Sequence, residues 1–541
     1  PIQGDTSMKA GPSGKLPSAT GGHKFSEVPR ADIQRSQFNR SFGYKTTFDA
    51  GLLIPVYVDE ALPGDTFNLN MTGFARLNTP IKPIMDNMVL DTFFFAVPNR
   101  LLWDNWERFN GAQDDPGDST DFTIPQISRV VGEGEIYDYM GLPTQTADPI
   151  SFSALPRRAY NLIYNEWFRD QNLQDSAEFF TDDGPDVYTF HFPRRRGKRH
   201  DYFTSCLPWP QKGDSVSLPL GTRAPVQPST IGTTQPHLQS PAMDARTLSS
   251  LGGVGVSVDI AAPPQLAIGA GGLSWVDDLT GLEADLSDAT AATINELRQA
   301  FQIQKLLERD ARGGTRYTEV IKAHFGVTSP DARLQRPEYL GGGSTPVLIS
   351  PIAQTGSTDL TTPQGNLAAM GTVSWSGHGF TKSFTEHCVL IGLACIRADL
   401  TYQQGMDRMW KRTTRFDFYW PSLAHIGEQA VLRQEIYATG TQVDDETVFG
   451  YQERFAEYRY KPSLITGKMR SNATGSLDIW HLSQDFIAPP VLNTNFIQEF
   501  PPVDRVVAVP TEPHFMFDSY FKLTCARPMP VWGVPGLIDH F

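Results

Sequence analysis

Acidic residues that could bind a metal ion gather in one short loop. Asp114, Asp115 and Asp118 lie close together, with Asp121 just beyond them. Carboxylate oxygens suit a hard cation, but this spacing does not follow an EF-hand loop. A solvated acidic turn around Pro116-Gly117 explains the same residues, so we expect no metal and no cofactor. If a metal does bind, Asp114, Asp115 and Asp118 are the candidate ligands.

Catalytic motifs are missing from the sequence. His378, Glu386 and His387 lack the HExxH spacing of a zinc protease, so we interpret the histidines as structural. The glycines at 341–343 lack the lysine of a phosphate loop. The glycine-rich run at 252–257 lacks the strand–helix context of a dinucleotide site, and the sequence contains no GxSxG motif of a serine hydrolase. A glycosidase carboxylate pair is set by the fold rather than by spacing, and nothing points to one. We predict that the chain is not an enzyme.

The densest basic run could bind nucleic acid. Its cations are Arg194, Arg195, Arg196, Lys198 and Arg199. They would neutralise phosphates without reading bases, and the flanking Tyr188, Phe190, Phe192, Tyr202 and Trp209 could stack on unpaired bases. Two alternatives stay open: a patch that pairs with acids of a neighbouring subunit, and a plain exposed loop.

The first 45 residues form a second basic segment, rich in Gly, Ser and Pro. Three acids, Asp5, Glu27 and Asp32, face seven cations: Lys9, Lys15, Lys24, Arg30, Arg35, Arg40 and Lys45. The whole chain carries a net charge of −14, so bulk electrostatics do not favour nucleic acid. A basic arm on an acidic body can contact nucleic acid inside a shell, and a solvated tail is the alternative.

Composition favours a β-rich chain. The 41 prolines and 46 glycines among 541 residues are spread along it, as expected for many short elements joined by turns. The four cysteines have no CxxC spacing, which predicts free buried thiols and a reducing cytoplasm; Cys388 and Cys395 should face opposite sides of one strand. No run is long enough to span a membrane and no secretory signal opens the chain.

Predicted strands lie toward both ends, around a helical and irregular middle. Three strands fall within 46–98, and others at 388–400, 476–482 and 515–528. Helices are expected at 99–111, from Pro156 through Trp167, and from a capping box at Thr293–Glu296 to Gly313-Gly314. The last helix should pack flat against the barrel or a neighbouring subunit.

A long segment from Gly213 to Ser287 differs from the rest. It is rich in Gly, Ser, Thr, Ala and Pro, and seven acids face two arginines. Such a segment could not form a core alone, which indicates an insertion. The expected organisation is therefore an arm at 1–45, a first part at 46–212, the insertion at 213–287 and a second part at 288–541.

Several long blocks of the chain resemble one viral family. They include RGKRHDYFTSCLPWPQKG at 196–213, HGFTKSFTEHCVLIGLACIRADLTYQQGMDRMW at 378–410, GYQERFAEYRYKPSLITGKMRS at 450–471 and the last thirty residues from Glu512. With 46–98 and 297–347, these blocks are similar to the major capsid proteins of gokushoviruses, small icosahedral phages (Microviridae) with single-stranded DNA. The resemblance covers most of the chain outside 1–30 and 213–287.

The resemblance implies a mainly β fold, a single eight-stranded jelly roll with large loop insertions that contain several helices. It implies sixty copies in a T=1 shell around circular single-stranded DNA, assembled in the cytoplasm of a bacterial host. The segment from Gly213 to Ser287 would be the threefold spike that attaches to a host receptor. Further partners would be a small basic DNA-binding protein, a DNA pilot protein and an internal scaffolding protein.

Aromatic residues are candidates for contacts between subunits: Trp103, Trp106, Trp410, Tyr419 and Trp420. Core packing is the competing explanation for each. Two other classes of function also fit parts of the sequence, a β-sandwich carbohydrate enzyme and a phage attachment protein that binds a host glycan. The basic arm favours a capsid protein, because neither alternative needs contact with a genome.

Overall fold

The computed structural model describes residues 34–214, 216, 294–327, 335–356 and 364–532, together with five short strands between 226 and 284. Nine strands form the main antiparallel sheet: β1 (Ser36–Asn39), β2 (Phe42–Phe48), β3 (Ile54–Ala61), β4 (Thr66–Leu77), β5 (Met88–Pro98), β13 (Glu338–Ala353), β14 (Leu367–Ser383), β15 (Cys388–Ala398) and β18 (Phe515–Arg527). Their order is β1-β18-β4-β14-β13-β5-β15-β3, and β2 also pairs with β18.

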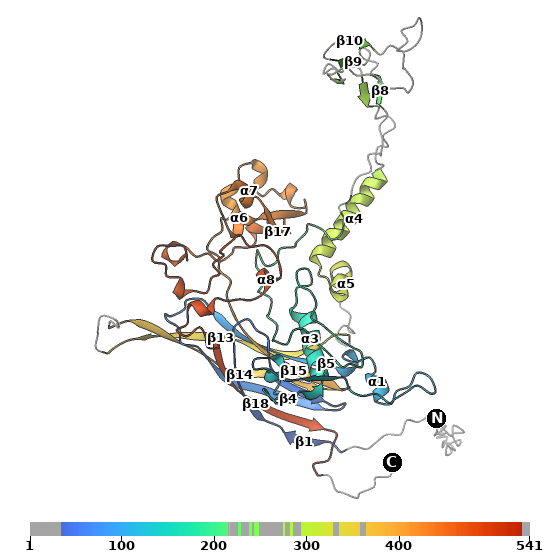
Figure 1. Ribbon diagram of the computed structural model, residues 1–541, viewed down its shortest axis with the longest axis vertical. Coiled ribbons are helices and arrows are strands. Elements are labelled where there is room, and N and C mark those ends of the chain that lie inside the picture. Colours follow the sequence, from blue (N-terminus) through green and yellow to red (C-terminus); the bar gives the residue numbers. More distant parts are fainter. Residues whose placement is uncertain are drawn as a thin grey trace, which may run out of the picture.

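The sheet folds over on itself at β13 (Figure 1). Residues Glu338–Val347 of this strand pair with β5, whereas Leu348–Ala353 pair with β14. The first half-sheet thus contains β1, β2, β18, β4 and β14, and the second contains β13, β5, β15 and β3. Because β1 and β2 occupy successive stretches of the same edge of β18, the nine strands fill eight positions. The predicted jelly roll is confirmed.

The main hydrophobic core lies between the half-sheets. Strand β18 alternates along most of its length, with Phe515, Phe517 and Phe521 buried and Met516, Asp518, Tyr520 and Lys522 exposed. Rings from the two halves meet, as in the pair Tyr57 and Phe521 with centroids 5.5 Å apart. Alternation of this kind is expected of strands with one face packed and the other in solvent.

Strand β15 is buried on both faces because a second core covers its other side. Its odd-numbered residues from Val389 to Leu393 pack against a layer built on α3 (Leu155–Ile163). Cys388 lies in the main core and Cys395 on the opposite face, as predicted. All four cysteines are free and buried, also as predicted.

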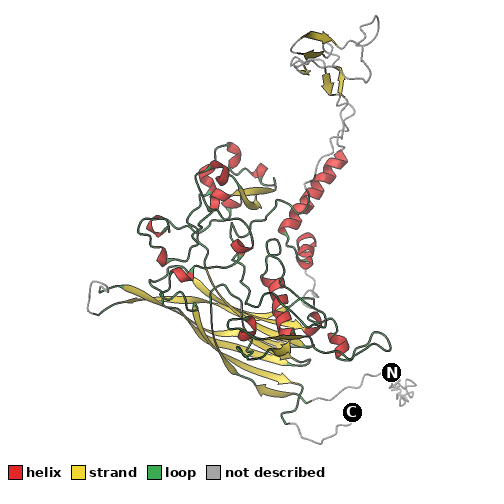
Figure 2. Ribbon diagram, in the orientation of Figure 1, coloured by secondary structure: helices red, strands yellow, loops and turns green. Residues whose placement is uncertain are grey.

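Two insertions carry the remaining elements (Figure 2). The insertion between β5 and β13 contains α1 (Trp106–Phe109), β6 (Gln126–Arg129), α2 (Ile136–Tyr139), β7 (Ile150–Ser153), α3, β8 (Val226–Pro228), β9 (His237–Ser240), β10 (Met243–Thr247), β11 (Ser274–Trp275), β12 (Leu282–Ala284), α4 (Ile294–Arg312) and α5 (Tyr317–Phe325). The insertion between β15 and β18 contains β16 (Glu428–Leu432), α6 (Arg433–Ile436), α7 (Gln442–Asp445), β17 (Val448–Glu453) and α8 (Thr494–Ile497). In the described part of the chain, no helix has the length and hydropathy needed to span a bilayer.

Some predicted boundaries are wrong. The basic arm does not extend to Lys45, because β1 and β2 pair with β18 and place residues from Ser36 onward in the sheet. The predicted strand at 476–482 is a 3-10 turn at Asp478–Trp480, stabilised by the Ser476 hydroxyl, which accepts the Asp478 N–H. The predicted helix at 99–111 is reduced to a 3-10 turn and the short α1.

Candidate assembly and nucleic-acid surfaces

The basic run at 194–199 lies between two other segments of the same chain and is hydrogen-bonded to both. Leu53 N–H donates to the Arg194 carbonyl, and Arg196 N–H donates to the Gly51 carbonyl. On the other side, Lys198 N–H donates to the Ile497 carbonyl and Glu499 N–H to the Arg196 carbonyl. These bonds hold the run inside the subunit, where its side chains meet partners from the same chain.

Arg196 is part of an ionic cluster around Asp91 of β5. Arg196 Nη1 and Arg397 Nε each lie 2.5 Å from Asp91 Oδ2, and the Ser344 hydroxyl donates to Oδ1 over 2.7 Å. Burial alone would raise the pKa of Asp91, but the hydrogen bonds from Arg397, Ser344 and Arg196 outweigh it, so this pKa is below its usual value. The cluster joins β5, β13 and β15 to the basic run.

The other cations of the run are also engaged. Lys198 is buried, and its Nζ donates to Gln484 Oε1 over 2.7 Å; burial lowers its pKa to about 8. Arg195 donates to the carbonyls of Ala50 and Glu499, and Arg194 lies over the Phe190 ring at 4.5 Å.

Arg194, Arg195, Arg196 and Lys198 thus already have partners within their own subunit. Contact with nucleic acid or with a neighbouring subunit stays a prediction for them. Only Arg199 is exposed, 4.0 Å from Asp399.

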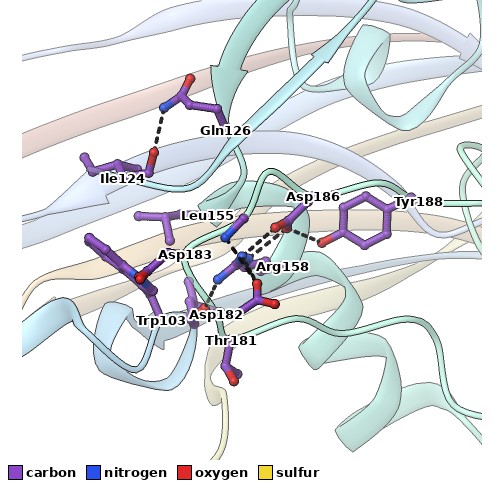
Figure 3. Close-up of polar contacts among 12 residues, drawn as sticks. Trp103, Ile124, Gln126, Leu155, Arg158, Thr181, Asp182, Asp183, Asp186 and Tyr188 are labelled. Atoms are coloured by element: carbon purple, nitrogen blue, oxygen red, sulfur yellow. Dashed lines mark hydrogen bonds and ion pairs between the residues drawn. The ribbon is translucent and has the colours of Figure 1, made fainter. Parts of the chain in front are cut away.

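A buried ion pair, which sequence reasoning missed, stabilises the first insertion (Figure 3). Arg158 of α3 has no exposed side-chain surface and makes two hydrogen bonds to Asp186, at 2.5 and 2.8 Å. Its Nη1 donates to the Leu102 carbonyl, and the Tyr188 hydroxyl also donates to Asp186. No local motif signals this pair, because its partners come from separate loops.

The five aromatic candidates divide into core and surface. Trp103 is 0 % exposed and donates through Nε1 to Asp183 over 2.6 Å, so its prediction as an inter-subunit contact is wrong. Trp106 is half-buried and packs against the same core. Trp410, Tyr419 and Trp420 are 71 %, 49 % and 41 % exposed, and they remain candidates.

We group these three with six other exposed apolar side chains of the second insertion, and we call all nine together the aromatic patch. The other members are Met409, Phe416, Phe418, Ile426, Tyr458 and Tyr460. A cavity of about 1430 Å³ lies between this patch and the Phe301 side of α4. So much exposed apolar surface is unusual for a monomer and typical of a protein–protein contact.

Helix α4 extends away from the sheet (Figure 1). Phe301 and Leu306 are 65 % and 51 % exposed, so the expectation that α4 packs flat against the barrel is wrong. The carboxy-terminal end of α4 is held within the chain, where Arg312 pairs with Glu428 and Glu453; packing against a neighbouring subunit stays a prediction. Strands β8, β9 and β10 lie beyond its amino end (Figure 1). The rest of Gly213–Ser287, apart from 213, 214, 216, β11 and β12, is outside the described residues.

The acidic loop and the histidines have structural partners. Asp118 Oδ2 accepts the N–H groups of Asp114 and Asp115, and no metal-binding cluster of His, Cys, Asp or Glu occurs in the described ranges. His378 is buried between the hydroxyls of Thr92 and Thr345, at 2.9 and 3.0 Å.

The predicted DNA-contacting residues of the arm divide at residue 34, where the described residues begin. Arg35 donates to the Gly64 carbonyl, and Arg40 pairs with Asp59 at 2.7 Å, so both are engaged within the subunit. Lys9, Lys15, Lys24 and Arg30 lie outside the described residues.

Comparison with known proteins identifies the family. Residues 26–537 match the family model described as "Capsid protein (F protein)". The chain belongs to this capsid protein family. Capsid protein VP1 of Bdellovibrio phage phiMH2K is 49 % identical, over 97 % of this chain and all of the relative. VP1 of Chlamydia phage 1 is 44 % identical (97 % and 99 % covered), and VP1 of Spiroplasma virus 4 is 37 % identical (95 % and 97 % covered).

The predicted gokushovirus-type major capsid protein is confirmed, and with it a structural rather than enzymatic role. The carbohydrate-enzyme and attachment-protein alternatives lose their support. For a capsid protein of Microviridae, which forms the virion capsid by self-assembly, large exposed apolar surface on a single copy is expected.

Proposed function

We propose that sixty copies of this capsid protein form a T=1 icosahedral shell around circular single-stranded DNA. The observation that carries the proposal is the match along nearly the whole chain to VP1 capsid proteins, together with a jelly roll whose insertions expose the aromatic patch. Closed symmetry requires each copy to meet several neighbours, and exposed aromatic side chains are favoured anchors of such contacts.

Trp410, Tyr419, Trp420 and the exposed edge of Trp106 are proposed as contacts between subunits. The neighbouring copy would bury them and fill the cavity beside α4. Truncating Trp410 to alanine should leave the subunit folded, because the side chain is 71 % exposed, but should reduce shell formation. Arg199→Ala, another exposed change, is the matched control.

The segment from Gly213 to Ser287 is proposed as a spike that binds a host receptor. Helix α4 would form its base, since it already extends away from the jelly roll. Deletion of residues 220–280 should spare folding and assembly and abolish adsorption to host cells; failure of the deleted protein to fold would contradict this assignment.

Other partners are proposed from the family alone: an internal scaffolding protein during assembly, a small basic DNA-binding protein and a DNA pilot protein in the particle. We place assembly in the bacterial cytoplasm, consistent with four reduced cysteines.

The shell is tested by sedimentation of the expressed chain with a nuclease-protection assay on the same fractions. The proposal predicts uniform megadalton particles that protect single-stranded DNA. A monodisperse monomer, even when the scaffolding protein of the same phage is co-expressed, would contradict it.

A further inference from the structure

One face of the jelly roll is covered by no described element. It is the outer face of the first half-sheet, which lies on the side of the molecule opposite α4 (Figure 1). We call it the outer sheet face. Its side chains are Lys45 and Thr47 of β2, Met516, Asp518, Tyr520 and Lys522 of β18, Asn68, Asn70, Thr72, Phe74 and Arg76 of β4, Met370, Thr372, Ser374 and Ser376 of β14, and Leu348, Ser350 and Ile352 of β13 where that strand pairs with β14.

The composition of this face differs from that of the whole chain. The chain has 60 acidic and 46 basic residues, yet the outer sheet face has one carboxylate, Asp518, and three cations. Asp518 is already paired with Lys45 at 2.8 Å. Within the described chain, Arg76 and Lys522 make no side-chain hydrogen bond or ion pair, so two cations are available to an anionic ligand.

Two exposed aromatic rings lie between these cations. Phe74 and Tyr520 are 48 % and 52 % exposed, although both come from the middle of long strands. In the register of β18 with β4, Tyr520 faces Thr72 and Asp518 faces Phe74. Phe74 and Tyr520 therefore occupy diagonal positions, whose backbones are roughly 7–8 Å apart. A hollow of about 580 Å³ opens beside Phe74 and is lined by Arg76, Lys45 and Met516.

This combination fits single-stranded nucleic acid. Sequence-independent proteins of this class pair a cationic surface that follows the backbone with aromatic rings on which bases stack. Hydroxyl and amide side chains, which make up most of the remaining face, supply further hydrogen bonds to phosphate and sugar. Exposed rings also anchor contacts between proteins. Nucleic acid is favoured here because the two rings lie between Arg76 and Lys522, two cations without a side-chain partner in the described chain.

We propose that the outer sheet face binds single-stranded DNA, with bases stacked on Phe74 and Tyr520 and phosphates bound by Arg76 and Lys522. The inference rests on the proposed function, since it assigns the genome to one face of the shell. The chain itself supports the placement: Lys9, Lys15, Lys24 and Arg30 precede β1, the edge strand of the same half-sheet. The basic arm therefore connects to an edge strand of this half-sheet.

The test measures binding of a fluorescein-labelled (dT)12 to the full-length unassembled chain by anisotropy over a range of salt concentrations. Phe74→Ala and Tyr520→Ala should each weaken binding roughly tenfold, and Tyr520→Phe should restore it, because the ring and not the hydroxyl stacks. Arg76→Gln with Lys522→Gln should reduce the salt slope by about 1.4, from two lost phosphate contacts. Tyr317→Ala, on exposed α5, is the matched control and should bind like the wild type.

Two results would overturn the inference. One is unchanged (dT)12 affinity in the Phe74 and Tyr520 variants. The other is loss of shells in these variants while (dT)12 binding stays normal, which would make the face a contact between copies. Failure of the wild-type chain to form DNA-protecting particles would contradict the proposed function instead, so the two failures are distinguishable. Crosslinking of 5-bromodeoxyuridine oligonucleotides should label Phe74 or Tyr520.

Discussion

Replacing Arg196 with methionine tests whether the basic run is structural. The side chain donates to Asp91, which is 6 % exposed, and lies over the Phe93 ring at 5.0 Å. A hydrogen bond to a charged group contributes about 1.5–3 kcal/mol and an exposed cation–π contact about 0.5–1 kcal/mol, so the loss should be about 2–4 kcal/mol. Arg397 and Ser344 still hold Asp91, which keeps the effect below the loss of a whole buried pair.

The matched control is Arg199→Met. Arg199 is the exposed member of the same run, and its weak pairing with Asp399 should contribute less than about 1 kcal/mol. Urea denaturation of the unassembled subunit, followed by tryptophan fluorescence, compares the two variants at their first transition, because a chain with several cores need not unfold in one step.

The account also predicts the DNA content of assembled particles. Arg196→Met should package as much DNA as the wild type, since the Arg196 side chain is paired with Asp91 inside the subunit. If Arg196→Met were as stable as Arg199→Met and packaged less DNA, the run would be a nucleic-acid surface and the assignment would fail.

Three further predictions concern the buried interior. Arg158→Met leaves Asp186 unpaired and should lower stability by about 3–5 kcal/mol in the same urea assay; a loss below 1 kcal/mol would contradict the buried pair. Burial lowers the pKa of Lys198 to about 8, so above that pH the unfolded chain holds one proton more than the folded chain. The free energy of unfolding should therefore rise with pH from about 8 toward 10, and Lys198→Met should lack this rise. Parallel curves of unfolding free energy against pH for the variant and the wild type would refute the prediction. Gly343→Ala would place a Cβ 2.3 Å from the His378 ring, so the variant should accumulate as insoluble protein, and soluble shells at wild-type yield would contradict the packing.

The sequence predicted the strands and helices whose pattern of apolar and polar residues is regular along the chain. Strands β3, β4, β5, β15 and β18 alternate or run apolar between clear turn signals, and α4 begins and ends where its capping box and glycines indicate. The strand predicted at 476–482 failed because its apolar residues alternate as in a strand although the chain turns there.

Strand β13 was not predicted, because its glycines resemble a loop. In the structure, Gly341–Gly343 lie inside the strand, where a Cβ at Gly342 would come within 2.0 Å of the Thr92 carbonyl oxygen. Close contact with β5 and with His378 excludes side chains at these positions, and such a requirement comes from distant strands that local sequence does not show.

The candidate surfaces were harder to predict, since they depend on pairs far apart in the sequence. Arg196 is 105 residues from Asp91, so its run appeared exposed when only neighbouring residues were considered. Both Trp103 and Trp410 were candidates on residue type alone, yet Trp103 is buried and Trp410 is mostly exposed. The outer sheet face emerges only when β18 and β4 are paired in register, because Phe74 and Tyr520 are widely separated along the chain.

Cryo-electron microscopy of the particles formed by the full-length chain would show both the shell and the orientation of the subunit within it. We expect closed T=1 shells in which the aromatic patch lies at contacts between copies and the outer sheet face lies against internal density for DNA. Shells of another symmetry, or a T=1 shell with the outer sheet face toward the solvent, would contradict this expectation.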